Sequence, residues 1–203
     1  MYDILSLYAN RNRQVHIIAI DEKPKQIVSD KRKPIPMKPG SPERYDYEYT
    51  RNGTANIFLA VEPLVGKRTT KVTKRRTKKD FAVFVKGVLD RYQKARKLHI
   101  ILDNLNTHFV SSFVETFGED WAKSMLQRVK FHYTPKHGSW LNIAEIEINV
   151  MDTECTDRRF GSFEELEKNV KAWEKMRNRA KAKIKWAFTR EKADQKLSKY
   201  YTK

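Results

Sequence analysis

Ile17-Ile18-Ala19-Ile20-Asp21-Glu22 is a short run of apolar, mostly β-branched residues that ends in two acidic ones. Ile100-Ile101-Leu102-Asp103-Asn104 repeats this pattern further along the chain. Each run predicts a buried strand, because such residues are enriched in sheets. A carboxylate at the end of a buried strand is costly unless it is solvated or binds a cation. Asp21 and Asp103 are therefore candidates for a metal-binding site.

Further segments with the periodicity of strands and helices surround these two runs. Lys31–Pro42 holds four prolines and is expected to be a loop, while Asn52-Gly53 predicts a hairpin turn. The expected strands are Val15–Ile20, Gln26–Ser29, Tyr45–Arg51, Ala55–Val61, Thr69–Arg76, Leu98–Leu102 and Val129–Tyr133. Helices are expected at residues 1–14, from Thr77 onward, at 107–117 and 119–127, from Ser139 to about Cys155, and from Ser162 past Trp173.

The order of these elements predicts an α/β fold. Several strands come first, and a helix, a strand, a helix, a strand and further helices follow, which favours a mixed sheet that is antiparallel early and parallel late. No internal repeat and no Pro/Gly/Ser linker divides the chain, so residues 1–203 are expected to form a single domain.

The composition points to a polyanionic partner. Lys and Arg number 42 against 25 for Asp and Glu, giving a formal net charge of +17 over 203 residues. Nucleic acid is the commonest such partner, although a ribosome-associated or merely soluble basic protein has the same balance. The apolar runs are too short to span a bilayer and no secretion signal is visible, so an intracellular protein without a membrane partner is expected.

A third carboxylate, Glu145, follows Trp140-Leu141-Asn142-Ile143-Ala144 on an expected helix. Two or three carboxylates from rigid elements can hold two divalent ions, the arrangement that breaks or joins phosphodiesters. Each candidate also has an ordinary structural interpretation. Asp21 and Asp103 can cap the turn or helix that follows, and Glu145 can be an exposed helix residue, as is expected for Glu147 and Glu154.

Several longer segments resemble the catalytic domain of IS630-type transposases, within the IS630/Tc1/mariner group of DDE transposases. They run in the family's order across nearly the whole chain. They are Ile20-Asp21-Glu22-Lys23-Pro24, Tyr47-Glu48-Tyr49 with Arg51-Asn52-Gly53-Thr54, Asp103-Asn104-Leu105-Asn106-Thr107-His108, Tyr133-Thr134-Pro135-Lys136-His137-Gly138-Ser139-Trp140-Leu141-Asn142 leading to Glu145, and Trp186-Ala187-Phe188-Thr189.

The resemblance implies an RNase H-like fold, a five-stranded mixed sheet flanked by helices. It also implies a catalytic triad of Asp21, Asp103 and Glu145, two Mg²⁺ or Mn²⁺ ions, and DNA transposition of an insertion sequence. The implied partners are the double-stranded DNA of the transposon ends and target, with the protein acting as a homodimer. The implied location is the cytoplasm of a bacterial or archaeal cell, associated with the nucleoid.

Two features depart from the family's pattern. Family members usually begin with helix-turn-helix DNA-recognition domains, and this chain begins about where the catalytic domain should, so these domains are expected to be absent. The spacing between Asp103 and Glu145 is longer than usual, which the expected helix at 119–127 absorbs and which leaves Glu147 as the alternative third carboxylate.

Residues near the triad motifs are candidates for DNA contact. His108 either contacts the scissile phosphate or supports a carboxylate, while Asn104 and Asn142 either orient the carboxylates or make ordinary local hydrogen bonds. Lys136 and His137 lie on the loop before the Glu145 helix, and the densest basic run contains Lys74, Arg75 and Arg76. Two other functions remain open: a catalytically inactive, DNA-binding remnant of a transposase, and an RNase H-like nuclease that acts on another nucleic acid.

Overall fold

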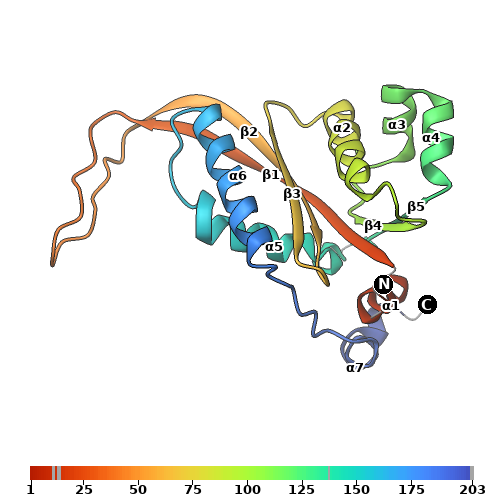
Figure 1. Cartoon of the computed structure of the whole chain (residues 1–203). Helices are drawn as coiled ribbons and strands as arrows, with labels where there is room; N and C mark the ends of the chain where they lie inside the picture. Colours follow the sequence, from red (N-terminus) through yellow and green to blue (C-terminus); the bar gives the residue numbers. More distant parts are fainter. Residues whose placement is uncertain (11, 13–14, 137, 202–203) are drawn as a thin grey trace.

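A five-stranded mixed sheet forms the centre of the protein (Figure 1). The structure is a computed structural model that describes residues 1–10, 12, 15–136 and 138–201. The strands are β1 (His16–Asp30), β2 (Tyr49–Glu62), β3 (Lys67–Thr73), β4 (Leu98–Leu102) and β5 (Val129–Tyr133), in the order β3-β2-β1-β4-β5. β1, β2 and β3 are antiparallel, whereas β4 pairs in parallel with β1 and β5. This arrangement confirms the predicted mixed sheet, antiparallel early and parallel late.

Helices cover both faces of the sheet. One face carries α1 (Tyr2–Ala9), α5 (Ala144–Met151), α6 (Phe163–Arg179) and α7 (Arg190–Tyr201). The other face carries α2 (Lys78–Leu89), α3 (Val110–Phe117) and α4 (Glu119–Leu126). Short helical turns at Asp90–Tyr92, Ser139–Leu141 and Asp152–Thr156 complete the set. Among the described residues, no helix is both long and apolar enough to cross a membrane.

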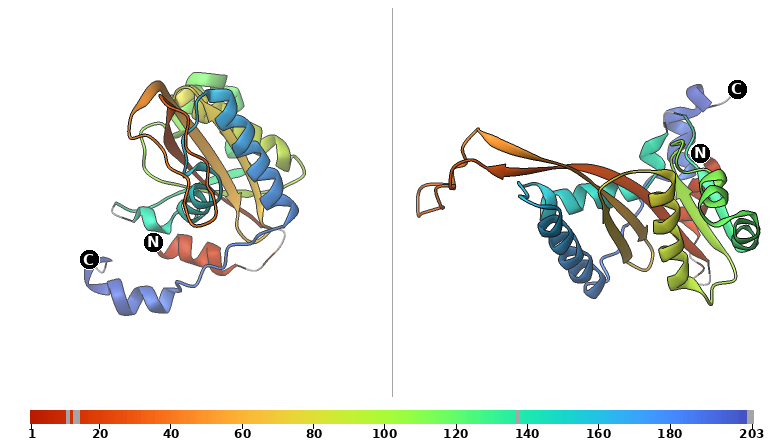
Figure 2. Two further views of the ribbon diagram at one scale, coloured as in Figure 1. Left: turned by 90° about the vertical axis from the view of Figure 1, so that its left-hand side faces the viewer. Right: turned by 90° about the horizontal axis from the view of Figure 1, so that it is seen from above.

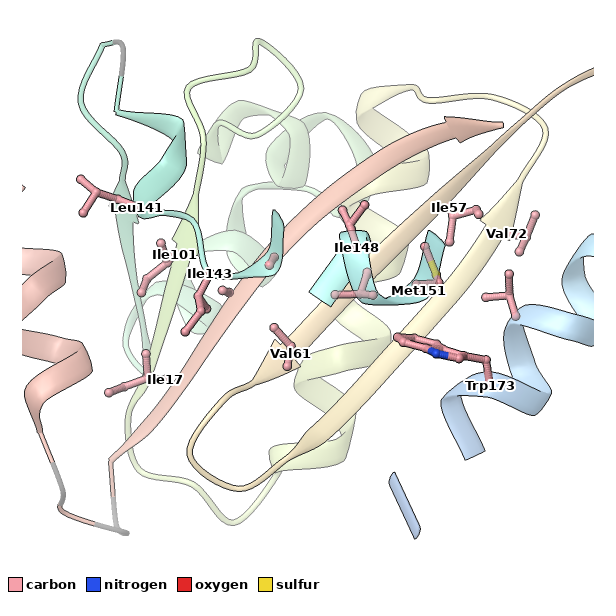
Figure 3. Packing of buried hydrophobic residues seen from close by; sticks show 14 of the residues in the cluster. Ile17, Ile57, Val61, Val72, Ile101, Leu141, Ile143, Ile148, Met151 and Trp173 are labelled. Carbon is pink, nitrogen blue, oxygen red and sulfur yellow. The ribbon is translucent and has the colours of Figure 1, made fainter. Parts of the chain in front are cut away.

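Alternation along the strands divides the core into two layers, because successive strand side chains point to opposite faces. Ile17 and Ala19 pack with α1, α5 and α6, as Figure 3 shows for Ile17 and its neighbours. Ile18 and Ile20 pack with α2, α3 and α4 instead. The same parity places Asp21 on the α5 face and Glu22 on the face of α2 and α3.

β1 and β2 extend beyond the sheet as a two-stranded arm that projects from the body (Figures 1 and 2). The expected separate strand Gln26–Ser29 is part of β1, and only the last three residues of the expected strand Tyr45–Arg51 belong to β2, which begins at Tyr49. The predicted hairpin turn at Asn52-Gly53 is also wrong. Ile27 pairs with Gly53 and Val28 with Arg51, so Asn52 is the extra residue of a β-bulge within a continuous strand.

Capping residues explain where α2 and α6 begin. Thr77 forms a capping box with Asp80 at the start of α2, and Ser162 accepts a hydrogen bond from the backbone N–H of Glu165 at the start of α6. The helix expected from Ser139 to Cys155 is broken instead. Asn142 adopts an extended conformation (φ −77°, ψ 99°) between the short turn Ser139–Leu141 and α5.

Candidate active site

The ends of two neighbouring parallel strands bring Asp21 and Asp103 together. The ladder between β1 and β4 pairs Ile18 with Ile100 and Ala19 with Ile101. Two further residues along each strand lead to Asp21 and Asp103, and adjacent strands lie about 4.8 Å apart. Asp21 lies near the end of the part of β1 that pairs with β4 and Asp103 directly follows β4, so the two acids form a pair at the carboxyl edge of the sheet.

Glu145 joins this pair from the first turn of α5. Asn142, which is 1 % exposed, fixes that turn, because its Nδ2 donates to the carbonyl of Ile20 over 2.9 Å and its Oδ1 accepts from the N–H of Ala144. The N–H of Glu145 donates to the carbonyl of Asn142 over 3.0 Å. The start of α5 is thus anchored to the strand residue that precedes Asp21, and Asn142 makes both a local helix hydrogen bond and a bond to β1.

The electrostatics of Asp21 show the proximity of the other acids. Burial, together with the negative charges of Asp103, Glu22 and Glu145, raises the pKa of Asp21 to about 7, although a hydrogen bond from the N–H of Glu22 opposes the shift. Within the described residues, no Lys, Arg or His forms an ion pair with Asp21 or Glu145. The cluster therefore holds negative charge that its own cations leave unbalanced.

Asp103 is held by His108 and, through it, by Glu22. His108 is fully buried, with Nδ1 2.5 Å from Asp103 Oδ1 and Nε2 3.0 Å from Glu22 Oε2. Burial alone would lower the pKa of His108, but its bonds to Asp103 and Glu22 outweigh burial and raise the pKa to about 9. Burial likewise favours a raised pKa for Asp103, yet the His108 hydrogen bond keeps that pKa below its ordinary value.

Arg76 connects this series of hydrogen-bonded side chains to the protein surface. Its Nη1 lies 3.3 Å from Oε1 of Glu22, whose side chain is only 2 % exposed. Glu22 was not predicted as a site residue, because it follows Asp21 directly. The alternation of β1 was the available signal, because it sends Glu22 to the opposite face, where His108 and Arg76 lie.

The predicted DNA-contact residues divide into exposed and buried ones. Lys136, Lys74, Arg75 and Arg76 are exposed, the last three in the loop between β3 and α2. His108 has no exposed surface to meet a phosphate, so its predicted DNA contact is not supported and it supports the carboxylate Asp103 instead. His137 lies outside the described residues.

Glu147 is excluded from the site by a buried ion pair, and its predicted exposure is wrong. Its carboxylate accepts from Nε and Nη2 of Arg68 over 2.6 and 2.9 Å, and both side chains are fully buried. Arg177 Nε lies 3.2 Å from the same carboxylate. Glu147 joins α5 to β3 and α6, and Glu145 is the carboxylate of α5 whose charge acts on Asp21.

The donor set fits a hard divalent cation. Asp21, Asp103 and Glu145 offer carboxylate oxygens, which are the ligands that Mg²⁺ and Mn²⁺ prefer. Among the described residues, no three acidic, His or Cys side chains already enclose a metal position. The fit therefore depends on the unbalanced negative charge around Asp21 and on the chemistry of the donors.

The sheet is mixed and carries two acids at its carboxyl edge. This arrangement is typical of RNase H-like enzymes, a class that cleaves nucleic acids. The chain belongs to the DDE superfamily endonuclease family, whose sequence profile matches residues 16–167. No curated protein matched the chain.

Solved structures show the same fold. The crystal structure of the Mos1 mariner paired end complex with Mn has a TM-score of 0.55 at 16 % identity, over 88 % of this chain and 55 % of that one. The Mos1 transposase paired-end complex with left transposon end has a TM-score of 0.54 at 16 % identity, over 87 % and 54 %. The chain thus spans about half the length of the Mos1 chains that it matches.

Proposed function

We propose that this protein is the catalytic domain of an IS630-type DDE transposase, which cleaves DNA strands and transfers them during transposition of an insertion sequence. Asp21, Asp103 and Glu145 are the proposed triad. The observation that carries the proposal is the largely buried Asp21 at the sheet edge, where burial first, and then the charges of Asp103, Glu22 and Glu145, raise its pKa to about 7. Such a raised pKa is expected where a site is built for a cation.

The triad residues are the ligands proposed for two Mg²⁺ or Mn²⁺ ions. When bound, such a pair of ions activates the attacking water or 3′-hydroxyl and stabilises the leaving oxygen. Asp21 and Asp103 sit on rigid strand ends, and Glu145 is fixed through Asn142 to β1. His108 and Glu22 hold the Asp103 carboxylate in one orientation, as supporting groups commonly do for metal ligands.

Double-stranded DNA, as transposon ends and target, is the proposed substrate. Lys74, Arg75 and Arg76 are exposed in one loop, and the bond of Arg76 to Glu22, the neighbour of Asp21, supports a role for this loop in DNA contact. Lys136 is exposed on the loop that leads to α5. These cations are suited to phosphate contact. Action as a homodimer, in the cytoplasm of a bacterial or archaeal cell, completes the proposal.

The test is nicking of supercoiled DNA in Mn²⁺ by the wild-type protein and by Asp21→Asn, Asp103→Asn and Glu145→Gln. Loss of nicking in all three variants is expected, while Glu119→Gln, a change at an exposed acid of α4, keeps full activity. Equal nicking by the wild type and the triad variants overturns the assignment.

Two other results favour the alternatives. An absence of cleavage by the wild-type protein, with retained DNA binding, supports an inactive remnant. Preferential cleavage of an RNA–DNA hybrid over duplex DNA supports a general RNase H-like nuclease. Binding weakens with salt in every case, so salt dependence does not discriminate among them.

A further inference from the structure

Two segments outside the family match pack behind the turn that presents Glu145. One is α1, and the other is residues 180–189, which we call the strap, between α6 and α7. Side chains of the strap alternate: Lys181, Lys183 and Lys185 are exposed, while Ile184, Trp186 and Phe188 pack on the core. Figure 1 shows α1 and α7 together at one end of the molecule, where the strap leads from α6.

Tyr8 of α1 makes the central contact with that turn. Its side chain is 5 % exposed, and its hydroxyl donates to the carbonyl of Leu141 over 2.8 Å and accepts from the N–H of Ile143 over 3.2 Å. Burial raises the pKa of this phenol, so the hydroxyl stays protonated and performs both roles. One hydroxyl thus ties the backbone on both sides of Asn142.

Hydrogen bonds of Asn142 connect this turn to the residues next to the proposed triad. Leu141, Asn142 and Ile143 are each at most 1 % exposed, so their backbone polar groups need partners within the protein. Asn142 donates to the carbonyl of Ile20, next to Asp21, and accepts from the N–H of Ala144, next to Glu145. The Tyr8 hydroxyl therefore fixes the residue that sets the start of α5 against β1.

The strap supports the same turn from outside. The rings of Trp186 and Tyr8 lie 5.0 Å apart, and Phe188 meets Trp140 edge-on with ring centroids 5.0 Å apart. Trp140 directly precedes Leu141 and packs against the core, so its contact with Phe188 supports the turn. Aromatic pairs at these separations contribute beyond the area that they bury.

We propose that Tyr8, backed by the strap, is a positioning residue for Glu145, so that segments outside the family match complete the metal site. The inference rests on the proposed function, because it requires Glu145 to be a ligand. A shift of one residue in the start of α5 rotates its side chains by about 100° and removes Glu145 from Asp21. The helix is interrupted at Asn142, directly before α5, so the position of Glu145 depends on contacts, such as those of Tyr8, that hold this turn in place.

The experiment compares the full-length wild type with Tyr8→Phe, which keeps the ring and removes the hydroxyl. Tyr2→Phe is the matched control, because Tyr2 lies on the same helix and its hydroxyl bonds Asp194 instead. The Mn²⁺ concentration that half-saturates thermal stabilisation and DNA nicking is measured for each. Amide hydrogen exchange of residues 141–147 in the metal-free protein reports on the turn alone.

Tyr8→Phe is expected to raise the half-saturating Mn²⁺ about tenfold, the usual effect of losing a group that orients a metal ligand. Exchange across residues 141–147 rises, and DNA binding without metal is unchanged. Tyr2→Phe behaves as the wild type. If Tyr8→Phe fails to fold, Phe188→Leu, which loosens Trp140 from the outside, is measured with the same expectation.

An unchanged Mn²⁺ requirement in Tyr8→Phe, in a protein whose wild type responds to Mn²⁺, overturns the positioning role and leaves the proposed function standing. A wild type that shows neither Mn²⁺-dependent stabilisation nor nicking overturns the proposed function together with the role of Tyr8. The two failures are therefore separate results of one experiment.

Discussion

At the scale of single residues, Asp21 is the most unfavourably placed side chain of the candidate site. Asp→Asn at this position removes the charge and keeps the shape, so the metal-free protein is expected to become more stable at pH 8, by about 1–3 kcal/mol. Because the pKa of Asp21 is raised from 3.8 to about 7, the native state binds the additional proton between these values. Its contribution to stability is greatest at low pH and is lost as pH rises through 7.

Urea unfolding of the wild type and Asp21→Asn between pH 5 and 8 measures this effect. The difference between the two proteins should grow toward pH 8, and added Mn²⁺ should stabilise the wild type alone. A variant that is less stable than the wild type at pH 8 without metal would contradict the electrostatic explanation.

Glu22 provides the second prediction at this scale, because it reaches Asp103 only through His108. Glu22→Gln weakens the bond to His108 Nε2 and frees Arg76, so the Asp103 carboxylate is held less firmly. Metal-dependent nicking is expected to fall about 10- to 100-fold, as it does when groups behind metal ligands are removed. The rate at saturating Mn²⁺ is the measurement, and Glu119→Gln is the control. Nicking at the wild-type rate would show that His108 alone orients Asp103.

At the scale of elements, the ion pair of Arg68 and Glu147 joins β3 to α5. Arg68 also donates to the carbonyl of Gly66 over 2.8 Å, so its buried guanidinium is well satisfied. Arg68→Met leaves the Glu147 carboxylate without its main partner, at an expected cost of about 3–5 kcal/mol. Chemical denaturation measures this cost, and Arg68→Met with Glu147→Leu should recover part of it. If Arg68→Met alone is as stable as the wild type, Arg177 is sufficient to balance the charge of Glu147.

Glu174 connects β3 to α6 and gives the protein an acid-sensitive contact. Burial would raise its pKa, but bonds from Thr70 and Lys171 outweigh burial and hold the pKa below 4.5. A lowered pKa gives stability that is fully present above the unfolded value of 4.5 and is lost as pH falls through the folded value. Glu174→Gln is expected to weaken the acid dependence of unfolding below pH 5. An unchanged acid limb of the unfolding profile would contradict this expectation.

Elements with a local physical signal were predictable from the sequence, and elements set by partners were not. The strands Leu98–Leu102 and Val129–Tyr133 and the start of a helix at Thr77 were confirmed, because apolar runs and caps act over a few residues. The arm was misjudged, because polar strands that pair only with each other lack a buried face, and a bulge resembles a turn in sequence. Glu147 was misjudged because its partner Arg68 is distant in the chain.

The site shows the same division. Register of the parallel strands brings Asp21 and Asp103 to one edge, which their positions after buried runs predict. Burial of His108 and the Glu22 bond depend on how α3 packs, so no local pattern indicates them. The Tyr8 contact joins residues more than 130 positions apart, beyond the reach of any short motif.

At the scale of the whole molecule, charge is distributed unevenly around the candidate site. The chain has a formal net charge of +17, yet the sheet edge at Asp21 is acidic, so the proposed DNA substrate would need cations around that edge to hold it. Lys74 and Arg75 are exposed in the loop that Arg76 joins to Glu22, the neighbour of Asp21 in the chain, and they are the cations proposed for this contact. Removing one cation that binds a DNA phosphate lowers the salt dependence of binding by about one unit in the log–log slope.

Lys74→Ala with Arg75→Ala is therefore expected to weaken duplex binding and to reduce that slope by about two units. The matched control is Lys86→Ala with Lys123→Ala, which removes the same charge from exposed positions on α2 and α4 whose ammonium groups already pair with Asp90 and Glu119. Fluorescence anisotropy of a labelled duplex over a range of KCl concentrations gives both slopes. Because both variants lower the net charge by two, a generally basic surface would change them equally. The slopes of the two variants differ only if the β3–α2 loop itself contacts DNA phosphates. Equal slopes would therefore remove this loop from the proposed DNA-binding surface.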